Sequence, residues 1–283
     1  MEARDSNVVI TNPRDANSAT RNACAAATPD GVAQAKIAAR HVSKSFAGAG
    51  GGITEVLRDI NLSVVENEFL VILGPGRCGK TTFLNIVCGL ERADSGGVYL
   101  DGEAVTGPDP KRGMVFQGMA LFPWSTVLEN VAMGPKFRGM GEKEREEKAA
   151  DYIKLVGLAG FEKSYPHQLS GGMKQRVGIA RAYCNDPEVL LMDEPFGHLD
   201  AQTRYQMEDE VLRIWEQAKR TVIFVTNNIE EAVYLGNRIV LLGRCPASVK
   251  AEYAIDLPWP RRYTDAKFLA LRKEIADNSD LAL

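Results

Sequence analysis

The feature that most constrains the fold is a glycine-rich turn between an apolar run and a helix-like segment. The apolar run covers 68–73, the turn at 74–81 has the pattern G-x-x-x-x-G-K-[ST], and residues 80–89 have the character of a helix. A strand, a glycine turn and a helix in this order open a βαβ unit. The glycines let successive backbone N–H groups point at phosphate oxygens, and the helix adds its positive N-terminal end. The sequence therefore predicts a phosphate-binding loop, and the flanking strand and helix disfavour a fortuitous glycine turn.

The side chains of this loop have separate expected roles. Lys80 is expected to reach the outer phosphates of a nucleotide, and the Thr81 hydroxyl to ligate Mg²⁺. The full set expected to hold the nucleotide here is Gly74, Pro75, Gly76, Arg77, Cys78, Gly79, Lys80, Thr81 and Thr82.

Two acids follow a second buried-looking strand. The apolar run 189–192 ends at Asp193 and Glu194. Carboxylates at the C-terminal edge of a parallel strand lie beside the phosphate loop in such sheets. Asp193 is expected to hold Mg²⁺ through water, and Glu194 to act as general base on the attacking water. The alternative is that the two acids only form a solvated turn, and the phosphate loop predicted upstream disfavours it.

The remaining pattern predicts an α/β protein. The continuous apolar runs 189–192 and 221–225 are typical of parallel strands buried on both faces, with 201–218 as the crossover helix between them. Further predicted elements are antiparallel edge strands at 37–46 and 56–65, helices at 142–158 and 176–183, a strand at 239–242, and a polar end from 251 with a helix near its close.

Composition excludes several classes of protein. The net charge of the 283 residues is −3, which argues against binding nucleic acid through bulk positive charge. The longest apolar runs fall far short of the roughly 20 residues of a membrane span. The five cysteines, Cys24, Cys78, Cys88, Cys184 and Cys245, form no CxxC pair, so we expect isolated thiols in a reducing compartment.

A second glycine motif precedes a predicted helix. The stretch 169–176 reads LSGGMKQR, which places Ser170, Gly171 and Gly172 at a helix start. A hydroxyl, two glycines and a helix N-terminus also suit a phosphate. The presence of two phosphate-binding elements in one chain is explained if the second element contacts a nucleotide held by another subunit.

Together GPGRCGKTT, LSGGMKQR and LLMDEP resemble the ATP-binding subunit of an ABC transporter over about 37–271. The resemblance implies a P-loop NTPase core with a mostly parallel sheet, an antiparallel β edge layer and an inserted α-helical subdomain. It also implies ATP hydrolysis and a head-to-tail dimer with two ATP molecules, each between one chain's phosphate loop and the partner's serine motif. It further implies an ATP-binding domain at 36–250 with its helical subdomain near 118–169, followed by an extension at 251–283. The segment 1–35 is rich in Ala, Asn, Thr and Asp without a sustained apolar period, which predicts a mostly disordered tail.

Other positions match the family residue by residue. Phe46 matches the aromatic that stacks on adenine, with an edge-strand core residue as the alternative. Gln117 matches the glutamine that senses Mg²⁺ and the γ-phosphate. Asp200 matches the aspartate of the loop that crosses the dimer interface.

The stretch 121–131, LFPWSTVLENV, resembles the importer branch for nitrate, sulfonate, taurine and related small anions. The resemblance implies a peripheral subunit on the cytoplasmic face of the inner membrane, working with a permease and indirectly with a solute-binding protein. Phe122, Pro123 and Trp124 would face the permease. The alternative is that Trp124 packs inside the helical subdomain.

The sequence departs from the family at several positions. Asn227 stands where the family has a histidine that bridges the γ-phosphate and the water. Loss of one charge-stabilising contact of this kind costs about 10²–10³ in rate. Arg77 and Asn67 replace glycines, and Arg77 in a left-handed conformation would cost about 1–2 kcal/mol. His198 in the interface loop is a weak candidate to replace the missing group.

Two functions remain in competition. The chain is expected to be an ATPase subunit that powers import of a small solute, because the base and metal residues are present. The alternative is a regulatory nucleotide-binding subunit with weak hydrolysis, paired with a competent homologue. A soluble P-loop protein such as a DNA-repair ATPase is disfavoured, because basic surfaces and long insertions are absent from the sequence.

Overall fold

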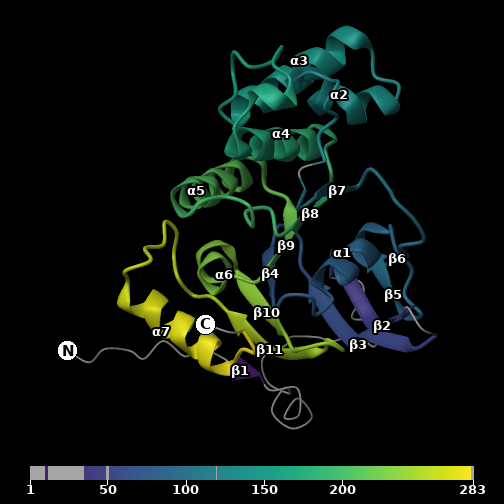
Figure 1. Ribbon diagram of the computed structural model, residues 1–283, viewed down its shortest axis with the longest axis vertical. Helices are drawn as coiled ribbons and strands as arrows, with labels where there is room; N and C mark the ends of the chain where they lie inside the picture. Colours follow the sequence, from purple (N-terminus) through teal and green to yellow (C-terminus); the bar gives the residue numbers. More distant parts are fainter. Residues whose placement is uncertain (1–9, 12–34, 49–50, 119, 282–283) are drawn as a thin grey trace. The chain divides into compact units, whose positions relative to one another are not determined.

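The computed structural model describes residues 10–11, 35–48, 51–118 and 120–281, which fall into two compact units. The first unit comprises Met1–Gly107 and Val225–Leu283, and the second Pro108–Phe224. Each contains strands and helices (Figure 1). The α/β class and the P-loop NTPase fold predicted from the sequence are confirmed.

The first unit contains the antiparallel edge layer. Its four-stranded sheet has the order β3 (Ile53–Val64), β2 (Ile37–Ala47), β5 (Ser95–Leu100) and β6 (Glu103–Ala104). Ile37 pairs with Val64 on one side and with Leu100 on the other. All three are buried, because one face of this sheet covers the core. The two predicted edge strands are therefore confirmed.

A second group of strands in this unit includes β4, the strand that leads into the phosphate loop. Strand β4 (Phe69–Leu73) pairs in parallel with β10 (Arg238–Leu242), which pairs antiparallel with β11 (Val249–Ala254). Every residue of β4 is buried, as its continuous apolar sequence requires. Helices α1 (Lys80–Cys88), α6 (Ile229–Leu235) and α7 (Ala266–Asn278) complete the unit, and α7 packs against α6.

The second unit combines parallel strands with most of the helices. Strands β7 (Arg112–Val115) and β8 (Val189–Asp193) are parallel, and β9 (Thr221–Thr226) lies beside β8. Between β7 and β8 the chain forms α2 (Val127–Phe137), α3 (Glu142–Leu155), the short η1 (Pro166–Gln168) and α4 (Gly171–Cys184). Helices α2, α3 and α4 pack against one another (Figure 1), and α5 (Ala201–Ala218) has the predicted bounds.

Some elements differ from the sequence prediction. The helix predicted at 176–183 begins at Gly171, because the Ser170 side chain caps it. The polar end contains strand β11 before its helix. Most of the predicted 1–35 tail lies outside the described residues, but Ile10–Thr11 forms β1, which pairs antiparallel with β11 at Tyr253 and Glu252.

Candidate functional site

The phosphate loop starts where β4 ends and closes at a glycine with a positive φ. Gly79 has φ of 118°, and a Cβ there would lie 2.8 Å from the side chains of Val56 and Leu57. Glycine is therefore required both for its backbone conformation and for the close contact with β3. Gly79 is also the N-cap of α1, so the loop ends at the positive end of that helix.

Two basic side chains lie along this loop. Lys80 is buried, and its Nζ donates to the carbonyl oxygens of Gly74 and Pro75, both at 2.9 Å. The amine is thus held over the start of the loop. Arg77 is exposed and has φ of 61°, which is the left-handed conformation expected to carry a steric cost. Asn67, before β4, has φ of 60°, a left-handed conformation that asparagine tolerates in turns.

A cavity of about 690 Å³ opens on the phosphate loop. Pro75, Gly76, Arg77 and Cys78 line it together with Asn227, which follows β9. The structure therefore brings Asn227 to the loop, as its match to the γ-phosphate histidine requires. Residues that the sequence did not single out also line this cavity: Arg244, Cys245, Asp280 and Leu281.

Phe46 lies near the end of β2 with 40% of its surface exposed. The Lys44 ammonium lies 5.1 Å from the centre of its ring. The alternative that Phe46 is a core residue is therefore wrong, and its ring is accessible to a planar ligand. Its stacking on adenine stays a prediction.

The second unit carries the acids and the glutamine. Asp193 is the last residue of β8 and is buried, and Glu194 follows with φ of 40°. The Gln117 amide Nε2 donates to the Glu194 carboxylate at 3.5 Å. The expected base and the expected glutamine are thus neighbours. A positive φ is uncommon for residues other than glycine.

The glycine motif and the interface loop lie side by side in the same unit. Ser170 is exposed, and its Oγ accepts from the Met173 N–H at 3.3 Å. A Cβ on Gly172 would lie 3.0 Å from the Thr203 methyl group. The Thr203 N–H donates to Asp200 at 3.0 Å, which lowers the pKa of that carboxyl. Ser170 and Asp200 therefore cap helices α4 and α5, respectively, at adjacent N-termini.

The 121–131 stretch presents an aromatic side chain to solvent. Trp124 is 73% exposed, and its ring centre lies 5.6 Å from that of Phe122. The alternative that Trp124 packs inside the helical region is therefore wrong. Asn130 is fully buried and fixes this loop through bonds to the backbone of Phe122, Ser125 and Thr126.

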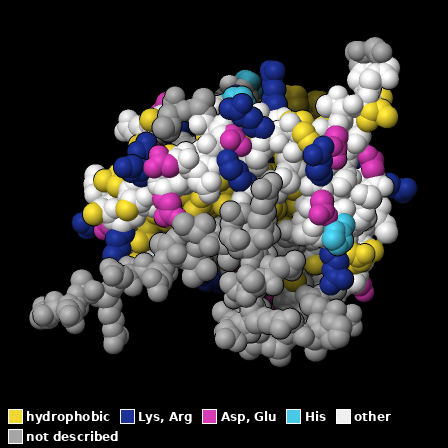
Figure 2. All heavy atoms as spheres, turned by 90° about the horizontal axis from the view of Figure 1, so that it is seen from below, with side chains coloured by type: hydrophobic (Ala, Val, Ile, Leu, Met, Phe, Trp, Pro, Cys, Tyr) yellow, Lys and Arg dark blue, Asp and Glu magenta, His cyan; other side chains and the backbone are white. Residues whose placement is uncertain are grey.

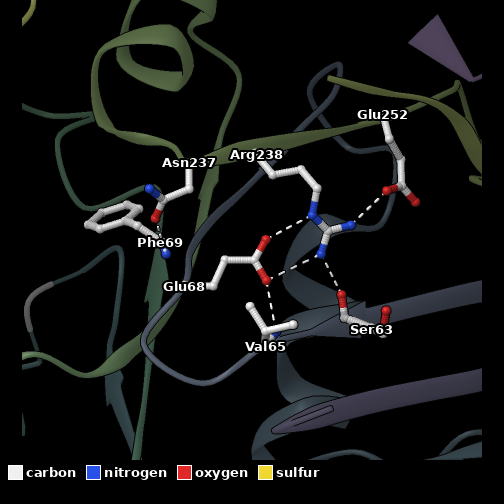
Figure 3. Close-up of polar contacts among 7 residues, drawn as sticks. All are labelled: Ser63, Val65, Glu68, Phe69, Asn237, Arg238 and Glu252. Carbon is white, nitrogen blue, oxygen red and sulfur yellow. Dashed lines mark hydrogen bonds and ion pairs between the residues drawn. The ribbon is translucent and has the colours of Figure 1, made fainter. Parts of the chain in front are cut away.

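A charged cluster anchors the strand below the phosphate loop (Figure 3). Arg238 at the start of β10 donates to Glu68 at 2.8 Å and to Glu252 at 2.6 Å. The Asn237 side chain accepts from the Phe69 N–H at 2.8 Å. These contacts tie the beginning of β10 to the beginning of β4. They support the parallel register in which Leu241 lies opposite Leu73.

Metal binding here would depend on few protein ligands. Among the described residues no group of three or more His, Cys, Asp or Glu side chains could hold a metal ion. The Thr81 hydroxyl in the first unit and the Asp193 carboxylate in the second are each hard oxygen donors, the kind of ligand that Mg²⁺ prefers. Mg²⁺ usually takes one or two protein ligands and completes its shell with water and substrate phosphates.

Charges of both signs are mixed on the surface of the described residues. On the face drawn in Figure 2, Lys and Arg side chains are interspersed with Asp and Glu side chains. Of the described helices, none has the length and hydropathy needed to span a bilayer. Four described cysteines are free, of which Cys245 is exposed.

Comparisons with known proteins agree on one family. The ABC transporter family pattern matches residues 57–197. An ABC transporter ATP-binding protein of Methanocaldococcus jannaschii is 50% identical over 240 residues, covering 85% of this chain and 90% of the relative. An aliphatic sulfonates import ATP-binding protein of Bacillus cereus is 44% identical over 239 residues, covering 84% of this chain and 94% of the relative.

Solved structures show the same likeness. A dimeric ATP-binding cassette in a post-hydrolysis state, bound to ADP and Pi, is 33% identical with a TM-score of 0.69, and it aligns over 78% of this chain and 100% of that one. A dimeric bacterial ABC transporter cassette is 34% identical with a TM-score of 0.70 and the same coverage.

Proposed function

Since this chain belongs to the ATP-binding proteins of ABC transporters and is an ATPase of that family, we propose that it powers import of a small anion through a membrane permease. The main support for this proposal is that the phosphate loop and Asn227 line the same cavity. An aliphatic sulfonate is the favoured solute, because relatives at 44–45% identity import that class. The subunit acts at the cytoplasmic face of the inner membrane.

Each side chain has a role toward the nucleotide. Phe46 stacks on adenine, Lys80 neutralises the outer phosphates, Glu194 accepts a proton from the attacking water, and Gln117 senses Mg²⁺ and the γ-phosphate. Thr81 and Asp193 would hold Mg²⁺, which neutralises the charge that develops on the phosphates. Buried Lys80 is held at the loop by two carbonyl oxygens, so its charge is placed before the nucleotide binds.

A second copy of the chain completes the site. Ser170, Gly171 and Gly172 of one copy bind the γ-phosphate of the ATP held by the other, and Asp200 lies at the interface. Exposure of Ser170 at the tip of α4 supports this role, and both structural relatives are dimeric. Trp124 faces the permease, which its 73% exposure supports.

The proposal is tested by ATP turnover of the chain assembled with its permease. We expect Glu194→Gln to reduce turnover by at least about a hundredfold while ATP still binds, because the base is lost and the phosphate loop is intact. Glu216→Gln is the matched control, because Glu216 is an exposed residue of α5. Its turnover should equal that of the wild type.

Two outcomes would contradict the proposal. If the wild type binds ATP but shows no turnover, the regulatory subunit with weak hydrolysis is the better account. Turnover that Glu194→Gln leaves unchanged would exclude Glu194 as the base.

A further inference from the structure

We propose that Arg244 is a further nucleotide-binding residue, whose guanidinium contacts the outermost phosphate of ATP. The inference rests on the proposed function of the phosphate loop. Arg244 lines the same cavity as Pro75, Gly76 and Arg77, although it lies about 170 positions away in the chain. It lies outside the GPGRCGKTT, LSGGMKQR and LLMDEP motifs.

The parallel register of β10 and β4 brings Arg244 to this position. Leu241 pairs with Leu73, so the segment after β10 leaves the sheet beside the start of the phosphate loop. A Cβ on Gly74 would lie 3.2 Å from Cβ of Leu242 and 3.3 Å from its carbonyl oxygen. The backbones of the two segments are therefore in contact two residues before Arg244.

The turn that carries Arg244 is held in place. The Gly243 N–H donates to the Ser248 carbonyl at 3.1 Å, which closes the turn. The Ala247 N–H donates to the Val56 carbonyl at 2.8 Å, and the Cys245 thiol contacts the Glu55 carbonyl at 3.3 Å. Since Gly79 also packs against Val56, the phosphate loop and this turn share one support on β3.

The charges around the cavity favour an anion. Arg244 and Arg77 line it, and neither forms an ion pair with another described residue. Asp280 is the acid that lines the cavity, and its carboxylate lies 3.2 Å from the Lys250 ammonium. The cavity therefore holds two arginines against one carboxylate, and that carboxylate already pairs with Lys250. A guanidinium suits a phosphate because it can donate two parallel hydrogen bonds.

The position of Asn227 points to the outermost phosphate. Asn227 lines the same cavity and occupies the place of the histidine that contacts the γ-phosphate in the family. Asparagine cannot carry a positive charge. Arg244 supplies a permanent positive charge in the cavity where that histidine is missing, whereas the inner phosphates are expected at the amides near α1.

The test compares ATP with ADP, because the two differ by the outermost phosphate. Binding to wild-type protein, Arg244→Gln and Arg244→Lys is measured by displacement of a fluorescent ADP analogue without turnover. We expect Arg244→Gln to weaken ATP binding about 10–100-fold, the range of a lost charge-assisted hydrogen bond, and ADP binding by less than about threefold. Arg244→Lys keeps the positive charge but not the forked guanidinium, so it should weaken ATP binding less than Arg244→Gln does.

Arg92→Gln is the matched control, since it removes the same charge from an exposed position away from this cavity. It should bind both nucleotides as the wild type does. Equal weakening of ATP and ADP in both Arg244 variants, or no weakening of ATP, would overturn the proposal for Arg244 while leaving the phosphate loop intact. Wild-type protein that binds neither nucleotide would instead refute the proposed function itself.

Discussion

Asn130 offers a sharp test of how the loop that carries Trp124 is built. Its Oδ1 accepts from the Phe122 N–H at 2.9 Å, and its Nδ2 lies within 3.2 Å of the carbonyl oxygens of Phe122, Ser125 and Thr126. The amide has only two hydrogens to donate to these three oxygens. Together with the bond that Oδ1 accepts, the side chain therefore makes about three full hydrogen bonds. The side chain is fully buried, so water cannot replace them.

We expect Asn130→Ala to lower the free energy of unfolding by about 3 kcal/mol, since each buried hydrogen bond contributes about 1 kcal/mol net. Urea unfolding followed by circular dichroism measures the change. Because this loop carries Trp124, permease-stimulated turnover should fall as well.

Asn61→Ala provides the matched control. Asn61 also accepts from a backbone N–H, that of His41 at 2.9 Å, and donates to Asp59, but it is exposed. Water can therefore take over its bonds, and a loss of less than about 1 kcal/mol is expected. If Asn130→Ala were no more destabilising than Asn61→Ala, the argument from burial would be refuted.

Three further predictions concern single residues. Arg77→Gly should raise the free energy of unfolding by about 1 kcal/mol in urea unfolding, because φ of 61° strains a residue with a side chain; no gain would contradict this. Asn227→His should raise turnover by about tenfold or more if the missing charge-stabilising contact limits hydrolysis, which would favour the regulatory subunit, and a smaller rise is expected if Glu194 already suffices as base. Burial raises the pKa of Cys184 to about 11, so at pH 8 a maleimide followed by mass spectrometry should label exposed Cys245 well before it; equal rates would contradict the assigned burial.

The sequence patterns that predicted the fold correctly are those with a strong local signal. The run at 189–193 is apolar throughout because both faces of β8 are buried, and 201–218 forms one amphipathic helix. Helix α2 was missed, although Thr126 and Glu129 form a capping box, because Pro135 inside the helix weakens the pattern.

Site residues could be proposed from the sequence where a contiguous motif, or a single match to the family such as Asn227, marked them. The glycine loop and the acids after β8 are local patterns with a known chemical purpose. Arg244 could not be placed in this way, because the parallel register of β10 with β4 determines its position. The positive φ of Glu194 likewise depends on its surroundings and has no signature in the sequence.

The central claim is that two copies of this chain clamp ATP between them. Light scattering of Glu194→Gln, which should bind ATP without hydrolysing it, measures the mass with and without Mg²⁺ and ATP. We expect the 31.0 kDa chain to be monomeric alone and to reach roughly twice that mass with saturating ATP. A mass that stays at 31.0 kDa while ATP is bound would contradict the account.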